Sequence, residues 1–241
     1  MKVTVEYDGT NYFGWQVQDG KPTVQGELSK AVATVTGRVT TIFGAGRTDA
    51  GVHALGQVAN FKTSCRIPAR KLAHALNAHL AHDISVVECV DAAESFHSQF
   101  DAVSKTYRYT VLNRELPSAL RRLTSHLLRT ALNDEALRAG AAHLAGTHDF
   151  RAFGSEMSKK EKTTRTISRF DVRREGDLVL FEVTGDGFLY NQVRAMVGTL
   201  IEVGLGKKPA EWVKEVREGK DRTKAGANVP AKGLCLVRVE Y

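Results

Sequence analysis

The residues best suited to chemistry lie in a glycine-rich stretch, GAGRTDAGVH, at positions 44–53. Glycine permits positive φ angles and lets the backbone approach a ligand closely. A carboxylate held in such a loop, here Asp49, can act as a base or as a nucleophile. The pattern also fits a tight connection in which Thr48 and Asp49 accept hydrogen bonds from backbone N–H groups. The grouping of Arg47, Thr48 and Asp49 with His53 favours a functional site.

Other well-known site patterns are missing from the sequence. Neither this loop nor VGLGKKP at 203–209 has the spacing of a nucleotide-phosphate loop. Cys65, Cys89 and Cys235 are far apart and lack the paired spacing of a zinc site or a disulfide framework. The sequence therefore predicts reduced thiols, no metal and no cofactor.

The charge balance favours a polyanionic partner. The 241 residues include 34 basic and 27 acidic side chains, a formal net charge of +7, which is a weak indication of nucleic-acid binding. An apolar content of 42% is ordinary for a globular protein with one large or two smaller domains. No apolar run is long enough to span a membrane, and the N-terminus begins directly in an alternating pattern. We expect a soluble cytoplasmic protein.

The first part of the chain has the pattern of a β-α-β-β-α-β unit. Residues 2–7 alternate and predict a strand, and a helix should begin at the cap Thr23 and end at Gly37. The remaining predicted elements are extended runs at 38–43 and 57–63, a helix over 68–80 and a strand over 84–90. This order is typical of a ferredoxin-like unit, whose antiparallel sheet carries two helices on one face.

The second part repeats this order loosely. Strands are predicted at 104–112, 165–174, 178–184 and 233–241, and helices at 133–145, 188–203 and 209–218. The predicted fold class is therefore α+β, with ferredoxin-like halves at residues 1–95 and 96–241. The halves should form one mixed, mainly antiparallel sheet with a central catalytic cleft.

Five segments together resemble the tRNA pseudouridine synthase A family over nearly the whole chain. They are VEYDGTNYFGWQ, GAGRTDAGVHALGQVANFKT, SKTYRYTVLN, FLYNQVRAMVG and PAKGLCLVRVEY. The resemblance implies isomerisation of uridine to pseudouridine at positions 38, 39 and 40 of the tRNA anticodon arm, without a cofactor. It also implies a homodimer, with the tRNA spanning both subunits.

In the resemblance, Asp49 matches the catalytic aspartate and Arg47 the arginine that helps to displace the target base from its stack. An ionised Asp beside the ribose can add to C1′ or remove the C2′ proton, and the sequence leaves both routes open. Without the family match, Arg47 would be read as a phosphate contact or a surface ion pair.

Three further residues match family positions in the second half. Tyr107 corresponds to the tyrosine that packs against uracil, Arg194 to the arginine that pairs with the catalytic aspartate, and Leu234 to a leucine of the uracil pocket. Each has a structural alternative: an aromatic core position for Tyr107 and Tyr109, a water-facing arginine, and a buried strand leucine.

Two other function classes compete with the isomerase. Tandem ferredoxin-like sheets can be non-catalytic RNA-binding modules, and an aspartate-dependent nucleosidase would break the same bond between ribose and base. Phosphate contacts, which position an RNA, are expected from basic residues outside the loop: Lys159, Lys160, Lys162, Arg121, Arg122, Lys207 and Lys208.

Overall fold

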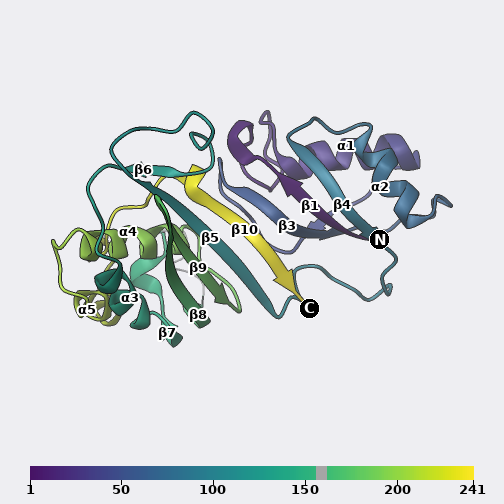
Figure 1. The fold of residues 1–241 in the computed structure, drawn as a ribbon. Coiled ribbons are helices and arrows are strands. Elements are labelled where there is room, and N and C mark those ends of the chain that lie inside the picture. Colours follow the sequence, from purple (N-terminus) through teal and green to yellow (C-terminus); the bar gives the residue numbers. More distant parts are fainter. Residues whose placement is uncertain (156–161) are drawn as a thin grey trace. The chain divides into compact units, whose positions relative to one another are not determined.

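The computed structural model describes residues 1–155 and 162–241 and divides into two compact units (Figure 1). The first unit comprises Met1–Val103 together with Cys235–Tyr241, and the second comprises Ser104–Leu234. This division falls later than the predicted boundary between residues 95 and 96, and the end of the chain returns to the first unit.

The first unit has the ferredoxin-like order of elements. Its strands are β1 (Lys2–Tyr7), β2 (Phe43–Gly44), β3 (His53–Asn60) and β4 (Ile84–Val90). They lie in the order β4-β1-β3-β2 with antiparallel neighbours. The final strand β10 (Leu234–Glu240) pairs in parallel with β3 through Cys235 and Leu236. The helices are α1 (Val24–Thr36) and α2 (Ala69–Asn77).

Local signals set the ends of α1 as predicted. The Thr23 side chain accepts a hydrogen bond from Gly26 N–H at 3.3 Å, and Gly37 ends the helix with φ of 72°. The prediction for α2 was too long, because the helix stops at Asn77, whose side-chain amide bonds both backbone groups of Val86 on β4. The predicted strand at 38–43 was also wrong in extent, since Phe43 is its only residue in β2.

The second unit packs three helices with an antiparallel sheet. Its strands are β5 (Ser104–Asn113), β6 (His126–Leu128), β7 (Gly146–Asp149), β8 (Thr164–Glu175) and β9 (Leu178–Gly185). The order is β5-β9-β8-β7, and β6 lies parallel to β5. The helices are α3 (Asp134–Ala142), α4 (Gln192–Gly204) and α5 (Trp212–Gly219). Short 3-10 helices of this unit occupy Arg151–Phe153, Arg222–Lys224 and Ala231–Gly233, and another lies in the first unit at Gly9–Asn11.

Two deviations from the predicted elements of the second unit have clear causes. Helix α4 begins at Gln192 instead of residue 188, because Asn191 before it adopts a left-handed conformation with φ of 65°. The short strands β6 and β7 were not predicted; none of their residues is buried, so they lack the alternating burial of longer strands.

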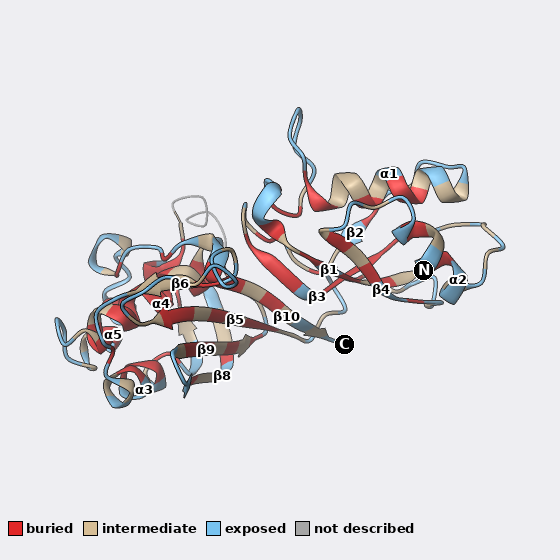
Figure 2. Ribbon diagram, turned by 45° about the horizontal axis from the view of Figure 1, so that its top comes forward, coloured by how far each residue is buried: buried red, intermediate tan, exposed pale blue. Residues whose placement is uncertain are grey.

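Each unit has its own apolar core, drawn in the buried colour along β3 and α4 (Figure 2). Fully buried side chains include Val3, Val5, Leu28, Leu72 and Leu76 in the first unit and Val111, Phe181, Val183, Met196 and Leu200 in the second. Most neighbouring strands are antiparallel, whereas β10 with β3 and β6 with β5 are parallel. The predicted α+β class with a mixed, mainly antiparallel sheet is therefore confirmed. Within the described residues, every helix is too short or too polar to cross a membrane.

Candidate active site

The glycine-rich loop joins β2 to β3 and is held to other segments through its backbone. The carbonyl of Thr48 accepts a hydrogen bond from Trp15 N–H at 3.1 Å, and Ala45 N–H donates to the Val58 carbonyl at 2.7 Å. The carbonyl of Asp49 accepts from Val52 N–H at 3.1 Å, which closes a turn directly after the acid. Asp49, near the middle of the loop, is half-buried.

Two buried polar side chains, Tyr7 and Gln57, form hydrogen bonds with the loop. We call them the loop anchors. The hydroxyls of Tyr7 and Thr48 lie 2.8 Å apart, and Gln57 Nε2 donates to the Gly46 carbonyl at 2.7 Å. The anchors are 3% and 0% exposed, and burial raises the pKa of the Tyr7 hydroxyl, which therefore stays neutral. These bonds hold the Gly46 backbone and the Thr48 side chain on either side of Arg47, which lies two residues before Asp49.

The approach of a second loop leaves room only for glycine. Gly14 has φ of 87°, and a Cβ added there would lie 2.4 Å from the Thr48 carbonyl oxygen. Any side chain at position 14 would therefore push the residue next to Asp49 out of place. His53 completes the underside, because its Nδ1 accepts a hydrogen bond from Gly9 N–H at 3.1 Å.

The roles of Tyr7, Gln57 and Gly14 were not predicted from the sequence. Tyr7 was assigned only to a strand face, and Gln57 only to an extended run. For Gln57 the visible signal was a polar residue among the mainly apolar residues of its strand, because a buried polar group needs a hydrogen-bond partner.

In the second unit, Tyr107 lies on β5 opposite Val183 and is 7% exposed. Its ring meets Phe188 edge-on, with centroids 5.2 Å apart and planes at 85°. Tyr109, on the same face, is fully buried and donates its hydroxyl to the Pro230 carbonyl at 2.8 Å. The alternative reading as a core residue is therefore correct for Tyr109.

Arg194 is half-buried near the start of α4. Its Nε donates to the Val229 carbonyl at 2.8 Å, and its Nη1 donates to Asn191 Oδ1 at 2.8 Å. The left-handed conformation of Asn191 positions that amide for the contact. The guanidinium is thus held in a fixed direction by two neighbouring segments.

The segment 229–234 contacts Arg194 and Tyr109 and contains Leu234. It accepts hydrogen bonds from Arg194 at Val229 and from Tyr109 at Pro230, and it ends at Leu234, which is 5% exposed. Arg47 and Asp49 lie together in the loop of the first unit, where the Arg47 side chain is exposed.

Of the basic residues expected to meet phosphate, five are exposed: Arg121, Arg122, Lys162, Lys207 and Lys208. Lys207 pairs with Glu202 at 3.1 Å. Lys159 and Lys160 lie outside the described residues. Over residues 1–155 and 162–241, no three His, Cys, Asp or Glu side chains are grouped to hold a metal ion.

A family model and individual relatives both match this chain in sequence. The family model described as tRNA pseudouridine synthase matches residues 3–101 and 141–241. A tRNA pseudouridine synthase A of Thermoanaerobacter sp. (strain X514) is 46% identical over 241 residues, which covers 100% of this chain and 99% of the relative. The enzyme of the same name from Acetivibrio thermocellus is 45% identical with the same coverage.

A crystal structure of a Cbf5-Nop10-Gar1 complex aligns with 99% of this chain and 58% of its own, at 13% identity and a TM-score of 0.41. The family model and the relatives match this chain in sequence. The chain therefore belongs to the tRNA pseudouridine synthase A family, and its activity is that of an isomerase that forms pseudouridine in tRNA.

Proposed function

We propose that this protein converts uridine to pseudouridine at positions 38, 39 and 40 of the tRNA anticodon arm, with Asp49 as the reacting carboxylate and no cofactor. The observation that carries the proposal is the support of the Asp49 loop. Hydrogen bonds from buried side chains hold the Gly46 carbonyl and the Thr48 hydroxyl next to an acid that is itself half-buried. Fixed placement of a reactive group is what an intramolecular rearrangement needs from an enzyme.

The reaction makes clear demands on this carboxylate. The bond from C1′ to N1 breaks, the uracil turns, C5 joins C1′, and the C5 proton is lost. Asp49 acts on the sugar, either by adding to C1′ or by taking the C2′ proton. Both routes need an ionised carboxylate, and neither needs a redox group.

The remaining roles in the proposal follow the family resemblance. Arg47 helps to take the target nucleotide out of its stack, as any enzyme that acts within a paired arm must do. Tyr107 packs against the uracil, and Leu234 lines its pocket. Arg194 pairs with Asp49 and favours its ionised form. The proposal requires residues of both units to act on one nucleotide, and it includes a homodimer that works in the cytoplasm.

The deciding experiment compares wild type with Asp49→Asn on an unmodified tRNA that carries uridines at 38, 39 and 40. We expect pseudouridine at those positions with wild type and none with Asp49→Asn, which should still bind the tRNA because it keeps the loop backbone. Asp19→Asn, an exposed acid elsewhere in the first unit, is the matched control and should keep full activity. Pseudouridine mapping and a binding titration provide the two readouts.

Each alternative gives a different result in the same assay. Equal modification by Asp49→Asn would remove Asp49 from the mechanism. Binding by wild type without product would leave an RNA-binding module, and release of free uracil would support a nucleosidase. An Arg194→Ala arm should lose turnover at near-normal affinity, whereas lost affinity with unchanged turnover would assign Arg194 to RNA docking.

A further inference from the structure

Two cationic side chains of the second unit lie on the same surface as Tyr107. Lys105 precedes Tyr107 by two positions on β5, so both side chains point to the same face of the strand. Lys105 pairs with Gly185 on β9 and is half-buried. The Cα atoms of Lys105 and Tyr107 are therefore about 7 Å apart along the strand.

Arg165, on β8, supplies the second charge. Its Nη1 donates to the carbonyls of Lys162 at 2.5 Å and Thr164 at 2.8 Å. The side chain runs over Gly187, where an added Cβ would lie 3.5 Å from Arg165 Nε. The guanidinium is thus held at the end of β9, beside the residue that precedes Phe188.

The two cations repel one another. Burial lowers the pKa of Lys105, and the positive charge of Arg165 lowers it further. Within the part of the chain that the structure describes, neither side chain forms an ion pair with an acid. Asp186 lies in the same segment, but its carboxylate accepts a hydrogen bond from Thr166 N–H at 3.0 Å. Two half-buried like charges raise the free energy of this part of the fold, and an anion bound beside them would offset that cost.

The cations and the aromatic ring share one short segment of backbone. Gly185 pairs with Lys105, Gly187 lies under Arg165, and Phe188 packs edge-on against Tyr107. A nucleotide whose base packs against Tyr107 carries its phosphates within reach of such a pair. Lysine binds phosphate as a point charge, and arginine adds directed N–H groups.

We propose that Lys105 and Arg165 bind a backbone phosphate of the tRNA next to the target uridine. This inference rests on the proposed function, because it takes the nucleotide at Tyr107 as the one that reacts. The contact positions the sugar and carries no sequence information, as phosphate contacts generally do.

The test uses a synthetic anticodon stem-loop with one target uridine, and copies in which a single phosphate beside that uridine is a neutral methylphosphonate. For Lys105→Met we expect a Kd about tenfold higher and a slope of log affinity against log salt lower by about one. The methylphosphonate at the contacted position should weaken wild type by a similar factor and Lys105→Met little further. Arg165→Gln should behave in the same way.

Matched variants keep the result interpretable. Lys214→Met removes an exposed lysine of α5 and should leave the Kd unchanged. Lys105→Arg keeps the charge and should stay close to wild type. An unchanged Kd and salt slope in Lys105→Met would overturn the proposal. It would also be overturned if, at each of the two phosphates beside the uridine, the methylphosphonate weakened Lys105→Met as much as it weakens wild type. Because binding is read without catalysis, product formed by Asp49→Asn would refute the proposed mechanism and leave this inference intact.

Discussion

The two segments that carry Asp49 and Arg194 are held in place by different forces. The Asp49 loop relies on directed polar contacts: hydrogen bonds with the loop anchors Tyr7 and Gln57, and one from Trp15 N–H. Helix α4 relies on apolar packing, since of its residues only Arg194 and Glu202 are not buried.

Because of this difference, substitutions in the loop should change the placement of Asp49, and substitutions in α4 should change the free energy of folding. A hydrogen bond contributes about 1 kcal/mol net, but it fixes an atom within tenths of an ångström. Truncation of a buried apolar side chain costs about 2–5 kcal/mol. Weakening the loop contacts should therefore misplace Asp49 with little loss of folding free energy, whereas weakening α4 should unfold the second unit before it changes the chemistry.

The largest expected effect is on stability, in Leu200→Ala. Leu200 is fully buried in α4, so the substitution leaves a cavity and should lower the free energy of unfolding by about 3 kcal/mol. Urea unfolding followed by circular dichroism measures the loss. Turnover per folded molecule should stay near wild type.

Glu202→Ala is the control on the same helix. Its ion pair with Lys207 is exposed, so the expected cost is below about 1 kcal/mol. If Leu200→Ala kept its stability but lost turnover, the contrast between the two segments would fail.

The next effect is on activity, in Tyr7→Phe. Removing the hydroxyl leaves Thr48 Oγ1 without this partner, and should lower the free energy of unfolding by about 1 kcal/mol. Because Asp49 follows directly, turnover should fall about tenfold, as expected when a reacting group is slightly misplaced. Single-turnover kinetics on tRNA measure the fall.

Tyr12→Phe removes a hydroxyl from the same unit and serves as the control. That hydroxyl donates to Asp83 Oδ1 at 2.5 Å, and the variant keeps the Tyr12 carbonyl, which accepts a hydrogen bond from Gly51 N–H of the loop at 3.3 Å. Equal losses of turnover in both variants would mean that the Tyr7 contact has no special role in placing Asp49.

The features that sequence predicted well are those with local causes. The cap at Thr23, the stop at Gly37 and the hairpin between β8 and β9, which turns at Gly176 with φ of 59°, all depend on residues close in sequence. The resemblance likewise named Asp49 because it lies in an unusual run of residues.

The features that sequence did not predict depend on distant contacts. Gln57 is an anchor only because its strand brings it under Gly46, and Asn77 ends α2 only because Val86 lies beside it. The return of β10 to β3 pairs Cys235 with His53, which lies far from it in the sequence. No local pattern encodes such pairings.

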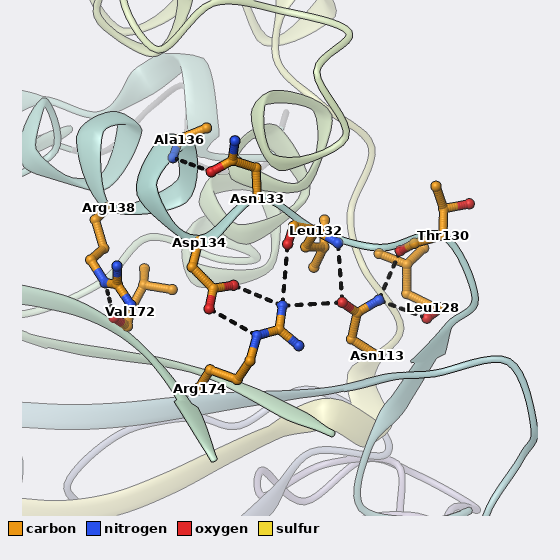
Figure 3. Close-up of polar contacts among 10 residues, drawn as sticks. All are labelled: Asn113, Leu128, Thr130, Leu132, Asn133, Asp134, Ala136, Arg138, Val172 and Arg174. Carbon is orange, nitrogen blue, oxygen red and sulfur yellow. Dashed lines mark hydrogen bonds and ion pairs between the residues drawn. The ribbon is translucent and has the colours of Figure 1, made fainter. Parts of the chain in front are cut away.

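Polar contacts also occur in the second unit, at the rim of its helical layer (Figure 3). Arg174 on β8 binds Asp134 at the start of α3 through two hydrogen bonds, Nη2 to Oδ1 at 2.7 Å and Nε to Oδ2 at 2.8 Å. Its Nη2 also donates to Asn113 Oδ1 at 3.2 Å. If polar contacts near the surface do not place the active groups of this unit, losing this one should leave turnover unchanged.

The smallest predicted effect is therefore that of Asp134→Asn, and it should depend on pH. Hydrogen bonds from Arg174 hold the pKa of Asp134 below its usual range. A carboxyl with a depressed folded-state pKa stabilises the fold above its unfolded pKa of about 3.9, and that contribution is lost as pH falls through the lower folded value. We expect a cost below about 1 kcal/mol at pH 7, discounted for partial exposure, and a smaller one below about pH 4.

Urea midpoints at pH 7 and at pH 3 measure this difference, with Glu175→Gln as a more exposed control for loss of a carboxylate. A cost independent of pH would mean that shape, not charge, holds Asp134 in place. A large loss of turnover would mean that the contact between β8 and α3 helps to position the reacting groups in addition to the hydrogen bonds of Arg194 to Val229 and Asn191, and the contrast between the two segments would then lie in burial alone.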